Sequence, residues 1–244
     1  MCARVAAARP SAGSVERVLA SIALTPSAPV LVPELAGAAA AEVAGIRDAA
    51  IAAASTLPDR WIAIGVGSED DVLADARGTF AGYGADVAVA LSSGATGPVA
   101  ALPLCALFAG WLRGQSNPGG AVSVRVHRAD LDADEAVDRG RLLRDLIDAD
   151  PGPIGVLVVA DGLRTLGPSA PGGEDPEAPP VQAALDDALA AGDTAALPGL
   201  PDGVVGRVAY QVLAGLAGSG PRSARELVRG APYGVGYFAG VWLP

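Results

Sequence analysis

Short apolar runs that alternate with helical segments constrain the fold of this chain most strongly. The clearest run, residues 154–160 (IGVLVVA), predicts a strand that is buried on both faces. Similar runs at 18–24, 61–67 and 122–127 alternate with segments of helical spacing, such as 132–148. Buried strands joined by helices predict an α/β protein with three layers (α/β/α) and a largely parallel, mixed central sheet.

Further segments complete this pattern. Additional helices are predicted over 34–55, 102–113, 181–191, 204–217 and 224–228, and additional strands over 86–91 and 233–243. In the helix over 132–148, Asp130 or Asp132 is placed to cap the first turn. The stripe of Val137, Leu142 and Leu146 in that helix is expected to face the core.

Composition suggests one folded unit without a membrane span. The chain has 244 residues, and 51% of them are hydrophobic, but no apolar run approaches the roughly 18–20 residues that a span requires. We expect residues 1–17 to be a flexible N-terminal tail and residues 18–244 to be a single domain. Arg4, Arg9 and Pro10 interrupt the apolar start, so no export signal is expected and the cytoplasm is the predicted location.

Charge and cysteine content exclude further classes of protein. The net charge of −10 argues against a nucleic-acid partner, which normally requires a basic surface. All 17 basic residues are arginine, and His127 is the single histidine. Cys2 and Cys105 are far apart in the sequence, so they predict neither a disulfide framework nor a zinc site.

A proline-rich loop follows the first predicted strand. Residues 24–37 (LTPSAPVLVPELAG) contain three prolines within eight residues. Proline fixes φ and favours an extended conformation in the residue before it, so this loop should be stiff. A stiff loop between a strand and a helix is suited to positioning a side chain, here Ser27.

Three segments, in this order, resemble the class III extradiol ring-cleavage dioxygenase family, LigB-like (the LigB/Memo superfamily). They are 26–37 (PSAPVLVPELAG), 156–164 (VLVVADGLR) and 231–237 (APYGVGY), and together they span nearly the whole chain. The resemblance implies a non-haem Fe(II) held by two histidines and a carboxylate, with open positions for a catechol and O₂. It also implies a further histidine that acts as acid and base on the ring hydroxyl.

The chain departs from the family pattern at each metal-site position. Ser27 stands where the opening motif has a histidine, and the strand that should precede the second metal histidine ends in Gly67. After Asp161 the chain continues with Gly162, and the family's serine–histidine pair is missing. With His127 alone, one chain cannot supply two histidines. We therefore expect a LigB-like protein that has lost the Fe(II) site and ring cleavage and needs no cofactor or metal.

Asp161 is the strongest functional candidate from the residues themselves. It follows the most apolar strand, and ligands of open α/β sheets bind outside the carboxyl ends of the strands. An aspartate that only caps the next turn is an equally good interpretation. Asp161 begins the loop 161–180, which has five prolines and four glycines and should be either functional or disordered. Ser27 and Glu34 are the other catalytic candidates, although Glu34 is also explained by helix capping.

The expected cleft would bind a small molecule or serve a regulatory role. Its candidate lining residues are Ser27, Gly65, Gly67, Asp161, Gly162, Arg164 and Tyr233. One alternative is an oxidoreductase, dioxygenase-type or hydrolytic enzyme with a rebuilt site around Asp161 that uses no histidine. A second alternative is a structural subunit of a hetero-complex, and either a homo-oligomer or a hetero-oligomer remains open.

Overall fold

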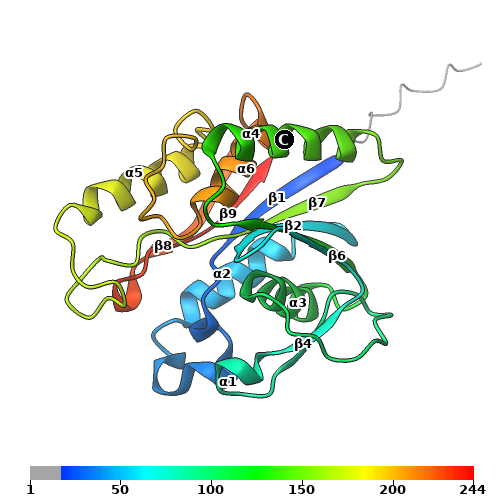
Figure 1. Ribbon diagram of the computed structural model, residues 1–244, viewed down its shortest axis with the longest axis horizontal. Helices are drawn as coiled ribbons and strands as arrows, with labels where there is room; N and C mark the ends of the chain where they lie inside the picture. The colour runs from blue at the N-terminus through cyan, green and yellow to red at the C-terminus, as the bar shows by residue number, and fades with distance from the viewer. Residues whose placement is uncertain (1–17) are drawn as a thin grey trace, which may run out of the picture.

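The computed structural model describes residues 18–244, which form one seven-stranded sheet with helices on both faces (Figure 1). The strand order is β3-β6-β2-β7-β1-β9-β8. The strands are β1 Leu19–Thr25, β2 Arg60–Gly67, β3 Asp71–Leu73, β6 Ala121–Arg128, β7 Ile154–Val159, β8 Ser223–Gly230 and β9 Tyr237–Leu243, and a separate pair is formed by β4 Arg77–Thr79 and β5 Ala88–Ala90. The four central strands β6, β2, β7 and β1 are parallel, and β3, β9 and β8 pair antiparallel.

Helices cover the two faces of the sheet as separate layers. The helices are α1 Pro33–Ala36, α2 Ala44–Ala54, α3 Leu104–Ser116, α4 Ala133–Asp148, α5 Ala178–Ala191 and α6 Arg207–Ala217, with short 3₁₀ turns at Pro29–Leu31, Gly37–Ala40, Phe80–Tyr83 and Pro232–Gly234. Helices α2 and α3 pack on one face, and α4, α5 and α6 pack on the other (Figure 1). The predicted three-layer α/β/α fold with a mostly parallel sheet is therefore confirmed.

Strand β7 shows why the apolar runs form the centre of the sheet. All six of its residues are buried. Leu157 and Val159 belong to the core under α2 and α3, whereas Val156 and Val158 belong to the core under α4 and α6. Because side chains alternate between the faces of a strand, only a continuously apolar run can serve both cores.

Two predicted helices differ from the structure, and the strand expected over 233–243 begins only at Tyr237, because residues 232–234 form a 3₁₀ turn. The single helix expected over 34–55 is interrupted at Gly37, whose positive φ of 52° is incompatible with a continuing right-handed helix. The helix expected over 224–228 is wrong, because these residues belong to strand β8. There, pairing with β9 outweighs the helix propensity of a short segment.

Helix α4 begins where the sequence predicts but presents a different face. The Asp132 carboxylate accepts a hydrogen bond from the Asp134 N–H at 2.9 Å, which confirms the cap. Leu142 and Leu146 are 63% and 59% exposed, so their expected core role is wrong, whereas Val137 is partly buried and packs against the core. The buried side of α4 consists of Ala136, Gly140, Leu143 and Ile147.

The contact between α4 and α6 depends on two glycines. A Cβ built on Gly140 would lie 2.0 Å from the carbonyl oxygen of Val212. A Cβ built on Gly215 would lie 1.9 Å from the carbonyl oxygen of Val137. The helix backbones therefore approach more closely than any side chain at these positions would permit, and this contact fixes which face of α4 meets the core.

The last two sequence expectations concern the N-terminal tail and membrane spans. The predicted tail, residues 1–17, lies outside the residues that the structure describes. Within residues 18–244, no helix combines the length and the apolar character needed to cross a membrane.

Candidate functional site

The carboxyl ends of the parallel strands meet at one edge of the sheet. β1 ends at Thr25, β2 at Gly67, β6 at Arg128 and β7 at Val159. Loops leave the sheet at this edge, which is where open α/β proteins bind their ligands. The proline-rich loop after β1 and the segment that starts at Asp161 after β7 leave adjacent strands.

Ser27 and Asp161 form a hydrogen-bonded pair at this edge. The Ser27 N–H donates to Asp161 Oδ1 at 2.8 Å, and the Ser27 hydroxyl donates to Asp161 Oδ2 at 2.6 Å. Both carboxylate oxygens are thus occupied by one residue of the proline-rich loop. Asp161 is 8% exposed, so the pair is largely shielded from solvent.

Burial dominates the electrostatics of Asp161. Desolvation raises the pKa of this carboxyl above its ordinary value, and the two bonds from Ser27 oppose that rise only in part. Burial also raises the pKa of the Tyr210 and Tyr237 hydroxyls, and the charge of Asp161 raises both further. The Tyr210 hydroxyl donates to the carbonyl oxygen of Ala160 at 3.0 Å. Asp161 is therefore a carboxyl group with a heightened affinity for protons.

The backbone after Asp161 is held on several sides. The N–H of Gly162 donates to the carbonyl oxygen of Gly236, and the N–H of Gly236 donates to that of Leu163, each at 2.8 Å. The carbonyl oxygen of Asp161 accepts from the N–H of Gly206 at 2.8 Å. This web fixes the backbone direction of Asp161 and thereby the position of its carboxylate.

Sequence reasoning missed a buried polar pair that supports this backbone. Gln182 Oε1 accepts from the Leu163 N–H at 2.8 Å, and Gln182 Nε2 donates to Asp186 Oδ1 at 2.8 Å. Burial raises the pKa of Asp186 to about 6. The available signal was the spacing: Gln182 and Asp186 are four residues apart and so share one face of α5 with apolar Leu185 and Leu189.

The glycines predicted to line the cleft are explained by close packing. A Cβ built on Gly65 would lie 2.3 Å from Cys105 Cβ at the start of α3. One built on Gly67 would lie 2.6 Å from Val126 Cγ1, and one on Gly162 would lie 2.2 Å from the Oε1 atom of the Gln182 side chain. These positions therefore require glycine for packing, whatever binds at the edge.

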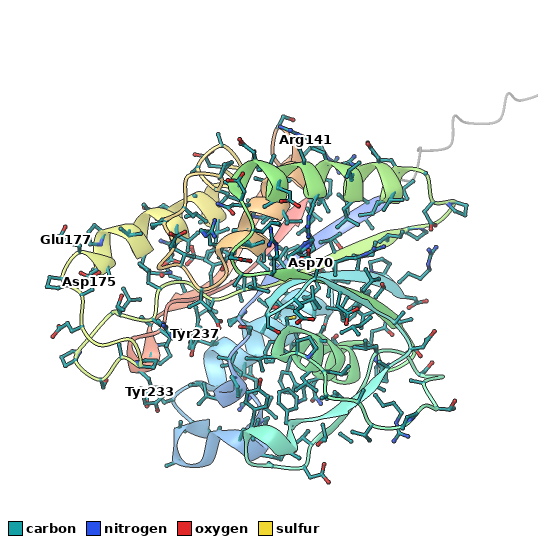
Figure 2. All side chains as sticks on the ribbon, in the orientation of Figure 1. Asp70, Arg141, Asp175, Glu177, Tyr233 and Tyr237 are labelled. Carbon is teal, nitrogen blue, oxygen red and sulfur yellow. The ribbon has the colours of Figure 1, made fainter. Side chains whose placement is uncertain are left out.

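The other predicted site residues, Glu34, Arg164 and Tyr233, are exposed, unlike the buried Asp161. Glu34 is exposed and lines a separate groove of about 300 Å³ beside Trp111 and Arg113. Arg164 is exposed. Tyr233 is 41% exposed, has a positive φ of 58°, and its hydroxyl donates to the Glu42 carboxylate. In Figure 2 Tyr233 lies at the periphery of the molecule.

The loop over 161–180 is ordered by contacts with its surroundings. Leu166 N–H donates to the Gly234 carbonyl at 3.0 Å, and a Cβ on Gly234 would lie 2.4 Å from Ala170 Cβ. Ala170 is 9% exposed. Of the two expectations for this loop, disorder is wrong.

His127 cannot pair with Ser27. It follows Val126, which belongs to the core under α2 and α3, so the alternation of the strand directs His127 to the α4 face. Ser27 follows β1, and in the sheet the strands β2 and β7 lie between β6 and β1. Two strands therefore separate His127 of β6 from Ser27, whose N–H and hydroxyl are both bonded to Asp161.

These residues do not fit the Fe(II) that the family resemblance implies. The pair supplies one carboxylate and one hydroxyl, whereas the family uses two histidines and a carboxylate. Among residues 18–244, no three His, Cys, Asp or Glu side chains gather in a way that could hold a metal ion.

Fold and site together define a three-layer α/β protein with a buried serine–aspartate pair at the carboxyl edge of its sheet. No family model and no curated protein sequence matches the chain. Among solved structures, the chain is similar to the uncharacterized protein JW3007 from Escherichia coli K12, with a TM-score of 0.50 and 11% identity. The match covers 92% of this chain and 100% of that one, and at this identity it shows the fold alone.

Proposed function

We propose that this chain is a LigB-like protein that has lost its iron site and binds a small molecule in the cytoplasm through Ser27 and Asp161. The hydrogen-bonded Ser27–Asp161 pair is the observation that carries the proposal. These two residues come from two of the three segments that resemble the family, 134 positions apart. Their meeting supports a retained site in which other chemistry has replaced the metal ligands.

The pair offers an acceptor and a donor to a ligand with hydroxyl groups. A carboxylate whose pKa is raised by burial accepts a hydrogen bond strongly, and the Ser27 hydroxyl can turn from Asp161 to the ligand. A phenolic ligand fits this chemistry, and the family resemblance makes catechol the natural probe. Tyr237, which is 4% exposed and senses the charge of Asp161, would form an apolar wall.

Calorimetric titration with catechol, under nitrogen, tests the proposal. Ser27→Ala and Asp161→Asn should weaken binding by about tenfold or more, the effect of removing a hydrogen bond to a charged group. Ser21→Ala and Thr194→Val are matched controls, because both remove a buried polar group elsewhere, and they should bind as the unchanged protein does. Equal affinity in all five proteins, or no binding at all, would reject this site.

Metal analysis tests the loss of iron separately. Protein from cells grown with added iron should carry far less than one iron atom per chain. Stoichiometric iron that disappears in Asp161→Asn would overturn the proposal, because it would mean that Asp161 is a metal ligand.

One observation favours an enzyme with a rebuilt site as a second candidate. The Ser27 hydroxyl donates to Asp161 at 2.6 Å, so the carboxylate is placed to take the hydroxyl proton in a hydrolytic reaction. Hydrolysis of para-nitrophenyl acetate that survives chelation and is lost in both Ser27→Ala and Asp161→Asn would support it. Hydrolysis that both variants retain would reject it.

The second alternative, the role of a structural subunit in a hetero-complex, stays a prediction.

A further inference from the structure

A second candidate site lies on the face of the sheet that α4 covers. A groove of about 500 Å³ runs between α4 and the edge formed by β3 and β6, within the size range of small-molecule sites. Its floor includes Val72 of β3, and its wall includes Leu142 and Leu146 of α4. These three apolar side chains are 55%, 63% and 59% exposed. Figure 2 shows Asp70, another lining residue, between α4 and the sheet.

Two hydrogen-bond donors in this groove have no partner. Arg125 and His127 are alternate residues of β6 on the α4 face, and both line the groove. Among the described residues, neither Arg125 Nε nor His127 Nε2 finds a hydrogen-bond partner, although both atoms are buried. His127 as a whole is 8% exposed. Unpaired buried donors cost folding free energy, so such a pair beside a groove indicates a missing acceptor.

The contacts of His127 fix which of its nitrogens carries the hydrogen. Arg139 Nη1 lies 3.4 Å from His127 Nδ1. A guanidinium can only donate, so Nδ1 is the acceptor and the neutral ring carries its hydrogen on Nε2. Burial and the Arg139 charge lower the pKa of His127 to about 4, which keeps the ring neutral at pH 7. Nε2 is therefore a donor without an acceptor.

Two of the charged residues that line the groove, Arg125 and Asp71, form no ion pair among the described residues. Asp70 is engaged by Arg139, with contacts of 2.8 Å to Oδ1 and 2.9 Å to Oδ2. Arg139 also pairs with Glu135 at 2.8 Å. Arg125 forms no ion pair within residues 18–244, whereas Asp71, exposed at the rim, uses its carboxylate to accept from the Val72 N–H at 2.7 Å. The floor thus presents one guanidinium and one imidazole N–H beneath an apolar wall.

We propose that this groove binds an amphipathic carboxylate, whose acid group meets Arg125 and His127 and whose apolar body lies along Leu142 and Leu146. Because Arg125 Nε and His127 Nε2 are both buried, binding requires part of the groove lining to shift so that the acid group reaches them. This site is independent of the proposed function, because neither Ser27 nor Asp161 lines the groove. The ligand class follows from the two unpaired donors, one of them on a guanidinium without an ion pair, and from the apolar wall.

The single histidine makes the test specific. In protein labelled with ¹⁵N-histidine, the only imidazole signals belong to His127. Decanoate is the probe, and decanol is the matched control without the charge. Decanoate should shift the Nε2 signal saturably, and decanol should bind about tenfold more weakly, as expected when the bond to a charged group is lost. No saturable shift, or equal titration by both probes, would overturn the proposal.

Variants separate this groove from non-specific binding. Leu146→Glu places a negative charge on the wall and should abolish the decanoate shift, whereas Val99→Glu alters a similarly exposed apolar residue, 55% exposed, outside the groove and should not. Arg125→Met should remove the preference for decanoate over decanol. Asp161→Asn should leave decanoate binding unchanged. Retained binding in Leu146→Glu would overturn the proposal.

Sedimentation velocity tests whether a second copy of this chain occupies the groove instead. The unchanged protein and Leu146→Glu should sediment alike. A dimer of the unchanged protein that Leu146→Glu dissociates would mean that a second copy fills the groove, which would also overturn the carboxylate proposal.

Discussion

At Ser27, one residue donates both its backbone N–H and its hydroxyl to a single buried carboxylate. The loop and the strand end are therefore fixed to each other at one point. The sequence located Asp161 because it follows the most apolar strand, and located Ser27 because three prolines surround it. It could not reveal their pairing, which depends on β1 and β7 being neighbours, nor the bond from the Leu163 N–H to Gln182, whose two residues come from different segments of the chain.

Asp161→Asn should change how stability depends on pH. Burial raises the pKa of Asp161 in the folded state, so the folded protein holds this proton more tightly than the unfolded chain does. The unchanged protein should lose stability relative to the variant as pH rises from the ordinary value of 3.8 through the raised pKa. The slope for one proton is at most about 1.4 kcal/mol per pH unit.

Urea unfolding of both proteins between pH 3 and 8 measures this difference, and the other acidic groups cancel in the subtraction. A difference that grows in the opposite direction would mean that the bonds from Ser27 outweigh burial and hold the pKa of Asp161 below its ordinary value.

At the scale of elements, the close contact of α4 with α6 decides which side chains become core. Apolar spacing predicted that α4 is a helix and where it begins, because both are local properties of the sequence. The same spacing predicted the wrong buried face for Leu142 and Leu146. The absence of a side chain at Gly140 and Gly215 lets the two helix backbones approach closely, and in this packing Leu142 and Leu146 face solvent. Strand β8 was missed for a related reason: its structure comes from pairing with β9.

Gly140→Ala should destabilise the protein by about 2 kcal/mol or more, as overpacking typically does. The added methyl group would meet the backbone of α6 at 2.0 Å from Val212 O and 2.7 Å from Leu216 N, so the helices must separate. Gly114→Ala in α3 is the matched control: its Cβ meets nothing within 4 Å, and alanine favours a helix by up to about 1 kcal/mol. Urea unfolding should move the two midpoints in opposite directions, and equal midpoints would contradict the close contact.

At the scale of the whole molecule, two cores share one sheet. Trp61 and Trp111 lie in the core under α2 and α3, and Trp242 lies in the core under α4 and α6. Since each residue of β7 faces one core and its neighbour faces the other, neither core can lose its packing while the sheet remains intact. The sequence predicted this layering, because strands buried on both faces require a helix layer on each side.

Leu112→Ala and Leu213→Ala, one in each core and both fully buried, should each cost about 2–5 kcal/mol. Each variant should shift one common unfolding transition. Trp242 fluorescence, observed alone after Trp61→Phe and Trp111→Phe, should report the same midpoint as circular dichroism. Separate transitions for the two probes would show that the layers unfold independently.

The packing of Cys105 against Gly65 makes it possible to measure how often the contact between α3 and β2 opens. Cys105 is 2% exposed at the start of α3, is the free cysteine of residues 18–244, and burial raises its thiol pKa to about 12. Only the thiolate reacts with alkylating reagents, so the Cys105 thiol should not be alkylated while α3 is packed on β2. In a Cys2→Ser background, the rate of alkylation would therefore measure how often α3 separates from β2 and exposes the Cys105 thiol. A ligand bound at the neighbouring edge of the sheet should lower this rate.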